Sequence, residues 1–101
     1  MSKKKITFKV TFVGGAGNIT FSAVDGLNAD KKLSSNQDTP IDEQSFDAEQ
    51  STGAQRMNVG GEAPSGGYIN VDVMDGEKAL KSVQFNDDEF DGEAISYEVE
   101  E

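Results

Sequence analysis

The residues with the clearest chemical potential are the carboxylates of an acidic segment late in the chain. Asp87, Glu89 and Asp91, followed by Gly92 and Glu98, match the spacing of an EF-hand calcium loop. Carboxylate oxygens are ligands that Ca²⁺ requires. The match is incomplete, because Glu89 occupies a position that takes Asp or Asn. The alternating residues that follow also predict a strand in place of the exiting helix.

A looser calcium site is an alternative that uses carboxylates from several loops. Asp25 and Asp30 flank one candidate turn, while Asp72 and Asp75 lie at another. Loops that are distant in sequence can converge at one end of a β-sandwich, so either pair is a candidate partner for the acidic segment. The competing interpretation makes that segment a solvated loop that promotes solubility.

Most enzyme chemistries lack their residues here. The chain has no Cys and no His, which excludes thiolate nucleophiles, the usual zinc sites and the Ser-His-Asp mechanism. Two carboxylates can hydrolyse a glycoside, but nineteen acids provide such a pair by chance, and Trp, a common sugar-stacking residue, is absent. The glycines at 14, 15 and 17 precede a predicted strand, whereas a phosphate-binding loop precedes a helix. We therefore expect no enzymatic activity.

Charge is both strongly negative and uneven. The net charge of −10 argues against direct binding of nucleic acid, because like charges repel. Residues 1–32 carry six Lys and two acids, whereas residues 87–101 carry eight acids and no base. This asymmetry predicts that a basic first strand lies beside an acidic last strand. It also allows a different function, in which the acidic surface mimics nucleic acid and inhibits a nucleic-acid-binding protein.

No stretch of the sequence resembles a membrane or export segment. No apolar run approaches the 18 residues of a membrane-spanning helix. Thr7, Lys9 and Thr11 interrupt the apolar stretch that a signal peptide needs. We therefore expect synthesis in the cytosol unless a signal was removed, which leaves an extracellular assembly as a compatible destination.

The elements that must position these residues are strands, because apolar and polar residues alternate with a period of two. The glycine-rich segment 14–17 predicts a hairpin connection between the first two strands, and Asp75-Gly76 predicts a turn. Irregular spacing predicts a bulge near Lys81 or Ser82. The strands expected from this pattern cover residues 5–13, 18–24, 67–74, 78–85 and 94–100.

The middle segment, 26–66, is polar and rich in glycine, and we expect part of it to be mobile. A structureless loop of about forty residues is unusual inside a domain, so hidden strands are expected. Phe46 and Ala48 alternate, as do Met57 and Val59, which predicts a short hairpin about residues 51–54. Leu33 belongs either to a short edge strand or to a loop that it pins to the core.

These patterns predict a single all-β domain over residues 1–101, an Ig-like antiparallel β-sandwich of about seven strands. A small β-barrel is the alternative. The expected core comprises Ile6, Phe8, Val10, Phe12, Ile19, Phe21, Ile69, Val71, Val73, Val83, Phe85, Ile95, Tyr97 and Val99.

The functional expectation is a non-enzymatic structural or protein-interaction module. Such a domain could decorate or join a larger assembly, for example a phage particle or a cell-surface structure. Its partner would be another protein or a second copy, since an unpaired strand edge can add a strand. The alternatives are an adhesion-type module that binds Ca²⁺ through Asp87, Glu89, Asp91, Asp25 and Asp30, and the nucleic-acid mimic. No cofactor other than Ca²⁺ is expected.

Overall fold

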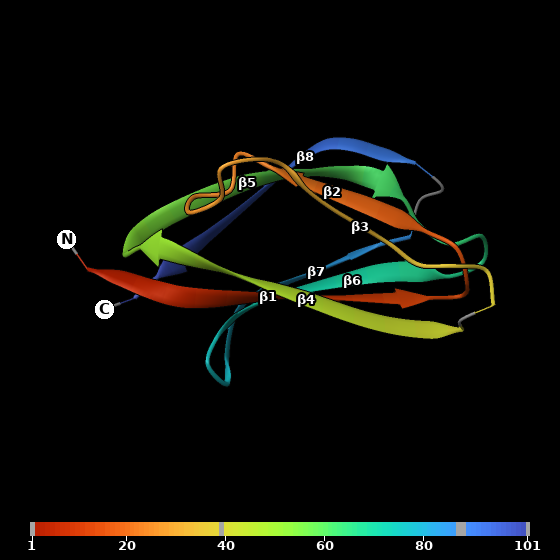
Figure 1. The fold of residues 1–101 in the computed structure, drawn as a ribbon, viewed down its shortest axis with the longest axis horizontal. Helices are drawn as coiled ribbons and strands as arrows, with labels where there is room; N and C mark the ends of the chain where they lie inside the picture. Colours follow the sequence, from red (N-terminus) through yellow and green to blue (C-terminus); the bar gives the residue numbers. More distant parts are fainter. Residues whose placement is uncertain (1, 39, 87–88, 101) are drawn as a thin grey trace.

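Eight strands and no helix make up the part of the chain that the computed structural model describes, residues 2–38, 40–86 and 89–100 (Figure 1). They form two four-stranded antiparallel sheets, in the orders β4-β1-β6-β7 and β3-β2-β5-β8. The all-β sandwich is thus confirmed, with one strand more than expected. The strands are β1 (Lys3–Val13), β2 (Asn18–Ser22), β3 (Lys31–Ser34), β4 (Ile41–Ser51), β5 (Gly53–Glu62), β6 (Tyr68–Asp75), β7 (Lys78–Phe85) and β8 (Phe90–Val99).

The Ig-like part of the prediction is not confirmed. In immunoglobulin constant-type domains the first two strands share a sheet. Here β1 lies between β4 and β6, whereas β2 belongs to the other sheet. Within those described ranges, the structure has no helix with the length and hydropathy needed to cross a membrane.

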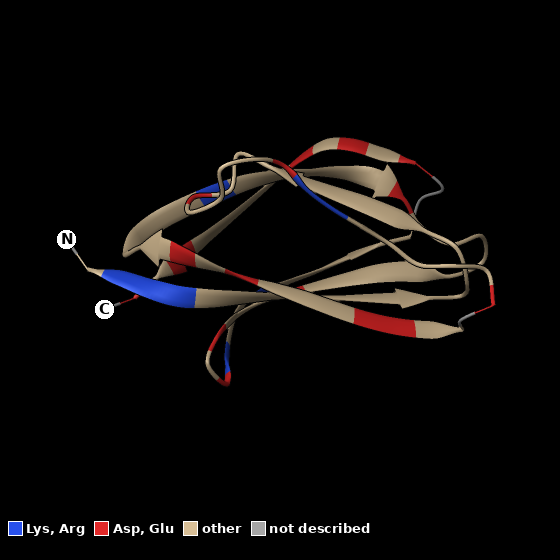
Figure 2. Cartoon of the chain, in the orientation of Figure 1, with Lys and Arg blue, Asp and Glu red and all other residues tan. Residues whose placement is uncertain are grey.

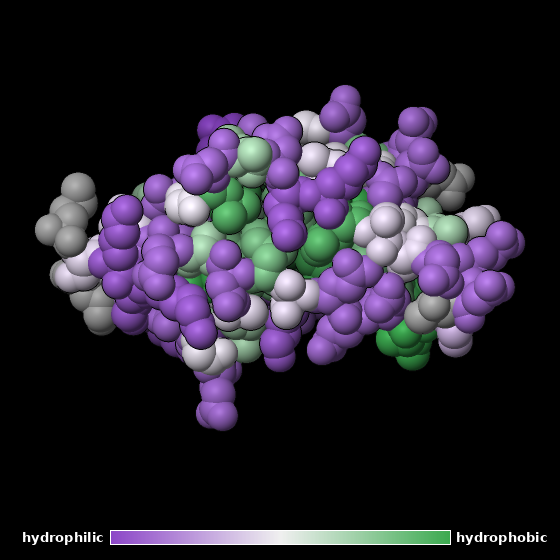
Figure 3. All heavy atoms as spheres, in the orientation of Figure 1, coloured by the Kyte–Doolittle hydropathy of each residue, from purple (hydrophilic) through white to green (hydrophobic). Residues whose placement is uncertain are grey.

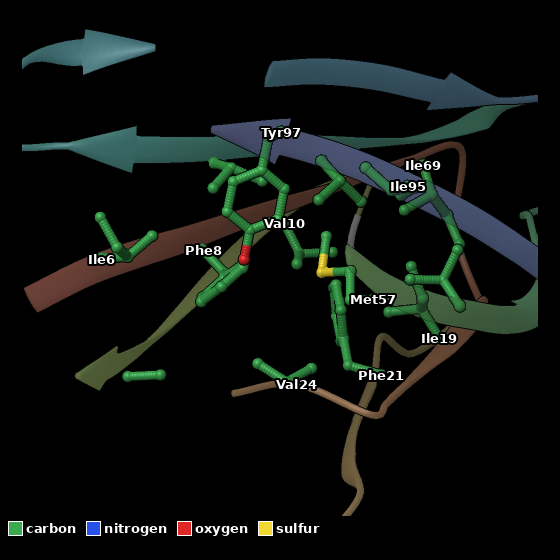
Figure 4. Close-up of a cluster of buried hydrophobic side chains, with 14 of the residues drawn as sticks. Ile6, Phe8, Val10, Ile19, Phe21, Val24, Met57, Ile69, Ile95 and Tyr97 are labelled. Carbon is green, nitrogen blue, oxygen red and sulfur yellow. The ribbon is translucent and has the colours of Figure 1, made fainter. Parts of the chain in front are cut away.

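The core fills the space between the two sheets, because alternate residues of each strand point inward. Ile6, Phe8, Val10 and Phe12 of β1 have no exposed surface, as their period of two predicts. Twelve of the fourteen expected core residues are buried, while Val83 and Phe85 on the edge strand β7 are only partly buried. Figure 4 shows side chains from both sheets meeting around Met57. The additional buried apolar residues are Val24, Ala48, Met57, Val59, Ala63 and Phe90.

Both predicted hairpins in the first half of the chain are wrong. The glycine segment at 14–17 carries the chain from one sheet to the other, because β1 pairs with β4 and β6 whereas β2 pairs with β3 and β5. The segment at 51–54 also changes sheets, since β4 and β5 are separated by Thr52 alone. Glycine supplies the positive φ that these sharp passages need, as at Gly53 with φ 109°.

The bulge expected near Lys81 or Ser82 is confirmed. It falls at Leu80, the residue before Lys81, because Val73 pairs with Lys81 and Met74 with Ala79. Another expectation is corrected. The basic first strand does not lie beside the acidic last strand, because β8 is in the other sheet and pairs with β5. The carboxylates that reach β1 come from its actual neighbours. Lys4 Nζ contacts Asp75 Oδ2 at 2.8 Å, and Thr7 Oγ1 donates to Asp47 Oδ1 at 2.8 Å.

Candidate functional site

Asp25, a predicted calcium ligand, is engaged by the backbone and side chains where the chain passes from β4 to β5. The backbone N–H of Ser51 donates to Asp25 Oδ2 at 2.9 Å, and Gln55 Nε2 donates to the same oxygen at 3.1 Å. The Ser51 hydrogen bond is the main reason that the pKa of Asp25 lies below its usual value, while partial burial opposes it. Through these hydrogen bonds, Asp25 holds the loop before β3 against the end of β4.

The buried side chain of Gln50 continues this hydrogen-bond network into the core. Gln50 has no exposed surface; its Nε2 donates to the backbone oxygen of Asp25 at 3.0 Å, and its Oε1 accepts from the Tyr97 hydroxyl at 2.5 Å. Burial raises the pKa of Tyr97 to about 12. The sequence pattern placed Tyr97 in the core but missed its partner, because one Gln in a polar segment gives no signal of burial.

The structure brings Glu89 and Asp91 to one hollow but places Asp25 far from them. Asp25 contacts Gln55 near the start of β5, whereas Asp91 lies beside Phe90, the pairing partner of Gly61. Six residues of strand, roughly 20 Å, separate those two positions. Asp30 and Glu89 are exposed, and Asp87 lies outside the described residues.

The remaining candidates are tied to other partners. Asp72 accepts a hydrogen bond from Ser82 Oγ at 2.6 Å, and Asp75 pairs with Lys4. In residues 2–38, 40–86 and 89–100, no group of three or more acidic side chains is close enough to hold a metal ion. Calcium binding stays a prediction, and it would need a site other than the predicted convergence.

A shallow acidic hollow of about 450 Å³ lies at the far end of β5 from Asp25. Glu62, Glu89 and Asp91 supply its carboxylates, Asn18 contributes an amide, and Gly61 and Phe90 complete the lining. Phe90 is buried because its ring stacks on Phe85 of the other sheet, with 4.3 Å between centroids. The hollow is therefore the surface of a packed sandwich end rather than an opening into the core.

The outer edge of β4 is a second feature, and its geometry follows from the register. Directly before and after β4, Gly14 N donates to Pro40 O, and Thr52 N donates to Ser2 O. The backbone groups at the even-numbered positions of β4 therefore bond to β1. Successive residues of a strand direct their N–H and C=O groups to opposite sides. Glu43, Ser45 and Asp47 therefore direct theirs away from β1. No described strand pairs with that edge.

One end of this edge is covered, and in the described part of the chain no backbone hydrogen bond reaches its centre. At one end Ser51 N–H donates to Asp25, and Gly26 lies so close to the Glu49 carbonyl that a Cβ there would overlap it. Within the segment, the Gln44 side chain reaches β3, where its Nε2 donates to the Ser34 carbonyl at 2.7 Å, and the outward backbone groups are not used in that bond. We call the backbone from Glu43 to Asp47 on this side the open edge of β4.

Comparison of the chain with protein-family models, with curated proteins and with solved structures finds no match.

Acidic side chains line the open edge of β4 on the outer face of the sheet. Between Ile41 and Ser51 the strand has four acids and no base, and Figure 2 shows acidic bands along it. Glu43, Asp47 and Glu49 are exposed, as is Ile41, with 65% of its surface accessible. Ile41 pairs with Val13, which pairs with Tyr68, so one row across the sheet is apolar.

The inner side of the same edge is apolar. Phe46 is half-buried and stacks on Phe8 with 4.8 Å between ring centroids. Lys31 Nζ lies 5.9 Å from the Phe46 ring centroid, within the range of a cation–π contact. Leu27 and Leu33 are also partly buried nearby in the core cluster. Figure 3 shows apolar atoms between polar ones on the face that β3 and β4 form.

Sequence reasoning missed this edge, although a signal was present. Acids at 43, 47 and 49 interleave with Phe46 and Ala48, which is the pattern of a strand that is apolar on one face and acidic on the other. The predicted short hairpin pairs this strand with the segment that follows it. In the structure β4 pairs with β1 instead, and its other edge has no described strand beside it.

Proposed function

We propose that this protein is a non-enzymatic interaction module that joins or decorates a larger protein assembly, such as a virus particle or a cell-surface structure. The observation that carries the proposal is the open edge of β4. It combines backbone groups that pair with no strand among the described residues, an acidic outer face and a half-buried aromatic ring. Unpaired strand edges are templates for another chain, and natural domains cover or charge them when they are not used. These features suit the binding of another chain, and the proposal assigns them no catalytic step.

The test is site-specific photo-crosslinking in the cells that produce the protein. A photoreactive residue replaces Ser45 on the open edge, and a matched control carries it at Asn28, which is also exposed. We expect one protein to crosslink at position 45 and not at position 28. That protein, purified, should then form a complex of defined stoichiometry by size-exclusion chromatography with light scattering.

Two results would oppose the proposal. Equal labelling at both positions, or none, would mean that the edge meets no specific partner. Turnover of any substrate by the purified chain would contradict the non-enzymatic part. Calcium-dependent adhesion and nucleic-acid mimicry stay predictions from composition, and no contact in the structure favours either over the interaction module.

A further inference from the structure

We propose that the open edge of β4 binds an extended segment in which basic and apolar side chains alternate, so that sheet β4-β1-β6-β7 gains a fifth strand. The inference rests on the proposed function and names the chemistry of the partner. Its first support is the backbone. Glu43, Ser45 and Asp47 present N–H and C=O groups in the arrangement that strand addition uses for affinity.

The outer side chains select the charge of the added strand. Residues directly opposite each other on adjacent strands have Cβ atoms about 4.5–5.5 Å apart, so charges there interact. Glu43 and Asp47 would face two residues on one face of the added strand, with the partner of Ser45 between them, and β4 has no base of its own. Lysine or arginine at those positions is favoured. A second copy pairing through its own β4 would place acids against acids, which argues against that occupant.

The inner side chains select the intervening residues. A strand that continues the sheet would direct every second side chain toward the other sheet, because the side-chain period is two. It would lie beside Phe46, whose ring is half-buried and already accepts one cation, Lys31. Apolar side chains there would cover the ring from solvent. Basic residues outward and apolar residues inward give the alternating pattern.

The competing explanation is that the acids only blunt the edge and prevent aggregation. The probe that separates the two is a capped ten-residue peptide of alternating Lys and Val. One control peptide alternates Glu and Val, and another has the same Lys and Val content in two separate blocks. Amide chemical shifts of the intact, isotope-labelled protein report where each peptide binds. We expect the alternating Lys-Val peptide to shift the amides of residues 43–47 and to bind at least tenfold more tightly than either control.

A matched pair of proline variants tests the backbone. Ser45→Pro removes an outward N–H that β1 does not use, and proline is tolerated on such edges. The control is Gln84→Pro on β7, the opposite edge of the same sheet. Asn70 of β6 pairs with Thr11 of β1 and with Gln84 of β7. The backbone groups of Asn70 bond to β1, so by the same alternation the N–H of Gln84 points away from β6. We expect Ser45→Pro to weaken peptide binding at least tenfold and Gln84→Pro to change it less than twofold.

A peptide modification provides the same test without any change to the protein. Methylation of alternate backbone nitrogens of the Lys-Val peptide removes donors from one of its edges, and should abolish binding when that edge faces β4. Reversal of charge in the variant Glu43→Lys with Asp47→Lys should transfer the preference to the Glu-Val peptide. Binding that is equal for the wild type and Ser45→Pro, or shifts centred on β7, would overturn the proposal.

The outcomes also distinguish this inference from the proposed function. If no peptide binds but position 45 crosslinks a cellular protein, the module stands and the basic strand is the wrong occupant. If the Lys-Val peptide binds as expected but no cellular protein crosslinks, the edge chemistry is right and the proposed function is wrong.

Discussion

At the scale of single residues, Tyr97 and Gln50 show how a polar group is held inside a small core. The Tyr97 hydroxyl donates to a side chain that has no exposed surface, and that side chain donates to the loop at Asp25. A buried acceptor that loses its donor costs about 1–3 kcal/mol. This pair therefore makes the core depend on one hydroxyl at the end of the acidic last strand.

The first prediction concerns the alkaline pH dependence of stability. The folded-state pKa of Tyr97, about 12, is above the usual value of about 10, so the folded protein binds the phenolic proton more tightly than the unfolded chain. The resulting stability is complete below pH 10 and is lost as pH rises toward 12. We expect Tyr97→Phe to be less stable at pH 7 by about 1–2 kcal/mol, because Gln50 loses its donor.

Urea unfolding at several pH values between 7 and 11.5 checks this prediction. The free energy of unfolding of the wild type should fall more steeply above pH 10 than that of Tyr97→Phe, because the variant lacks the buried phenol at position 97. Parallel curves for the two proteins would show that the Tyr97 proton is not coupled to folding.

At the scale of strands, the close approach of β2 and β5 depends on one glycine. A Cβ at Gly61 would overlap the backbone carbonyl of Asn18. The overlapping atoms belong to the backbone, so the clash cannot be relieved by moving a side chain. At the adjacent Gly60 the closest contact of a Cβ would be the Asp91 carboxylate at 3.3 Å, a side chain that can move, and the nearest backbone atom, the Phe90 carbonyl oxygen at 3.5 Å, is at an ordinary contact distance. Gly61→Ala should thus destabilise the protein by about 1–3 kcal/mol, the usual cost of overpacking.

The neighbouring variant Gly60→Ala is the control for this second prediction. It should change the midpoint of thermal unfolding little or raise it slightly, because alanine restricts the unfolded chain more than glycine does. Two variants of equal stability would mean that the strands can separate locally at Gly61 without cost.

The strands themselves were largely predictable, and their pairing was not. Alternation in β1 or β6 shows which residues point inward, since burial on one face leaves a period of two in the sequence. It does not show which strand lies alongside. Gly14, Gly15 and Gly53 have positive φ, which suits a hairpin and a passage between sheets equally well. Contacts between distant segments decided between them.

Composition predicts candidate calcium ligands by residue type but not their surroundings. Asp25 is one of these candidates, and its carboxylate accepts hydrogen bonds from Ser51 and Gln55, while calcium binding itself stays a prediction. Phe90 was assigned to a solvated acidic loop, because carboxylates surround it, yet its ring is stacked on Phe85. The residues that contact Asp25 and Phe90 are not adjacent to them in sequence. Composition alone therefore could not identify what either residue contacts.

At the scale of the whole molecule, charge repulsion opposes the compact state. The net charge of −10 is concentrated in a domain whose radius of gyration is 13.3 Å, and it remains after every base has been counted, including the paired Lys4 and Lys78. Salt screens repulsion between exposed charges over about 10 Å at 0.1 M. We therefore expect the urea midpoint at pH 7 to rise when NaCl increases from 0.02 to 0.5 M.

The control for this third prediction uses the same salts near pH 4.3, the isoelectric point, where the net charge disappears. The rise should be much smaller there, because no net repulsion remains to be screened. A fall in the midpoint with salt at pH 7 would show that attractive pairs outweigh the overall repulsion.

The single residue between β4 and β5 has a mechanical consequence. Most of the contact between the sheets of a sandwich is side-chain packing, which slides under load. Here Thr52 joins an edge strand of one sheet covalently to an inner strand of the other. A tensile force applied along β4 is therefore transmitted through the backbone into the middle of the second sheet. A protein that holds two bodies together under strain would distribute the load over both sheets by this route.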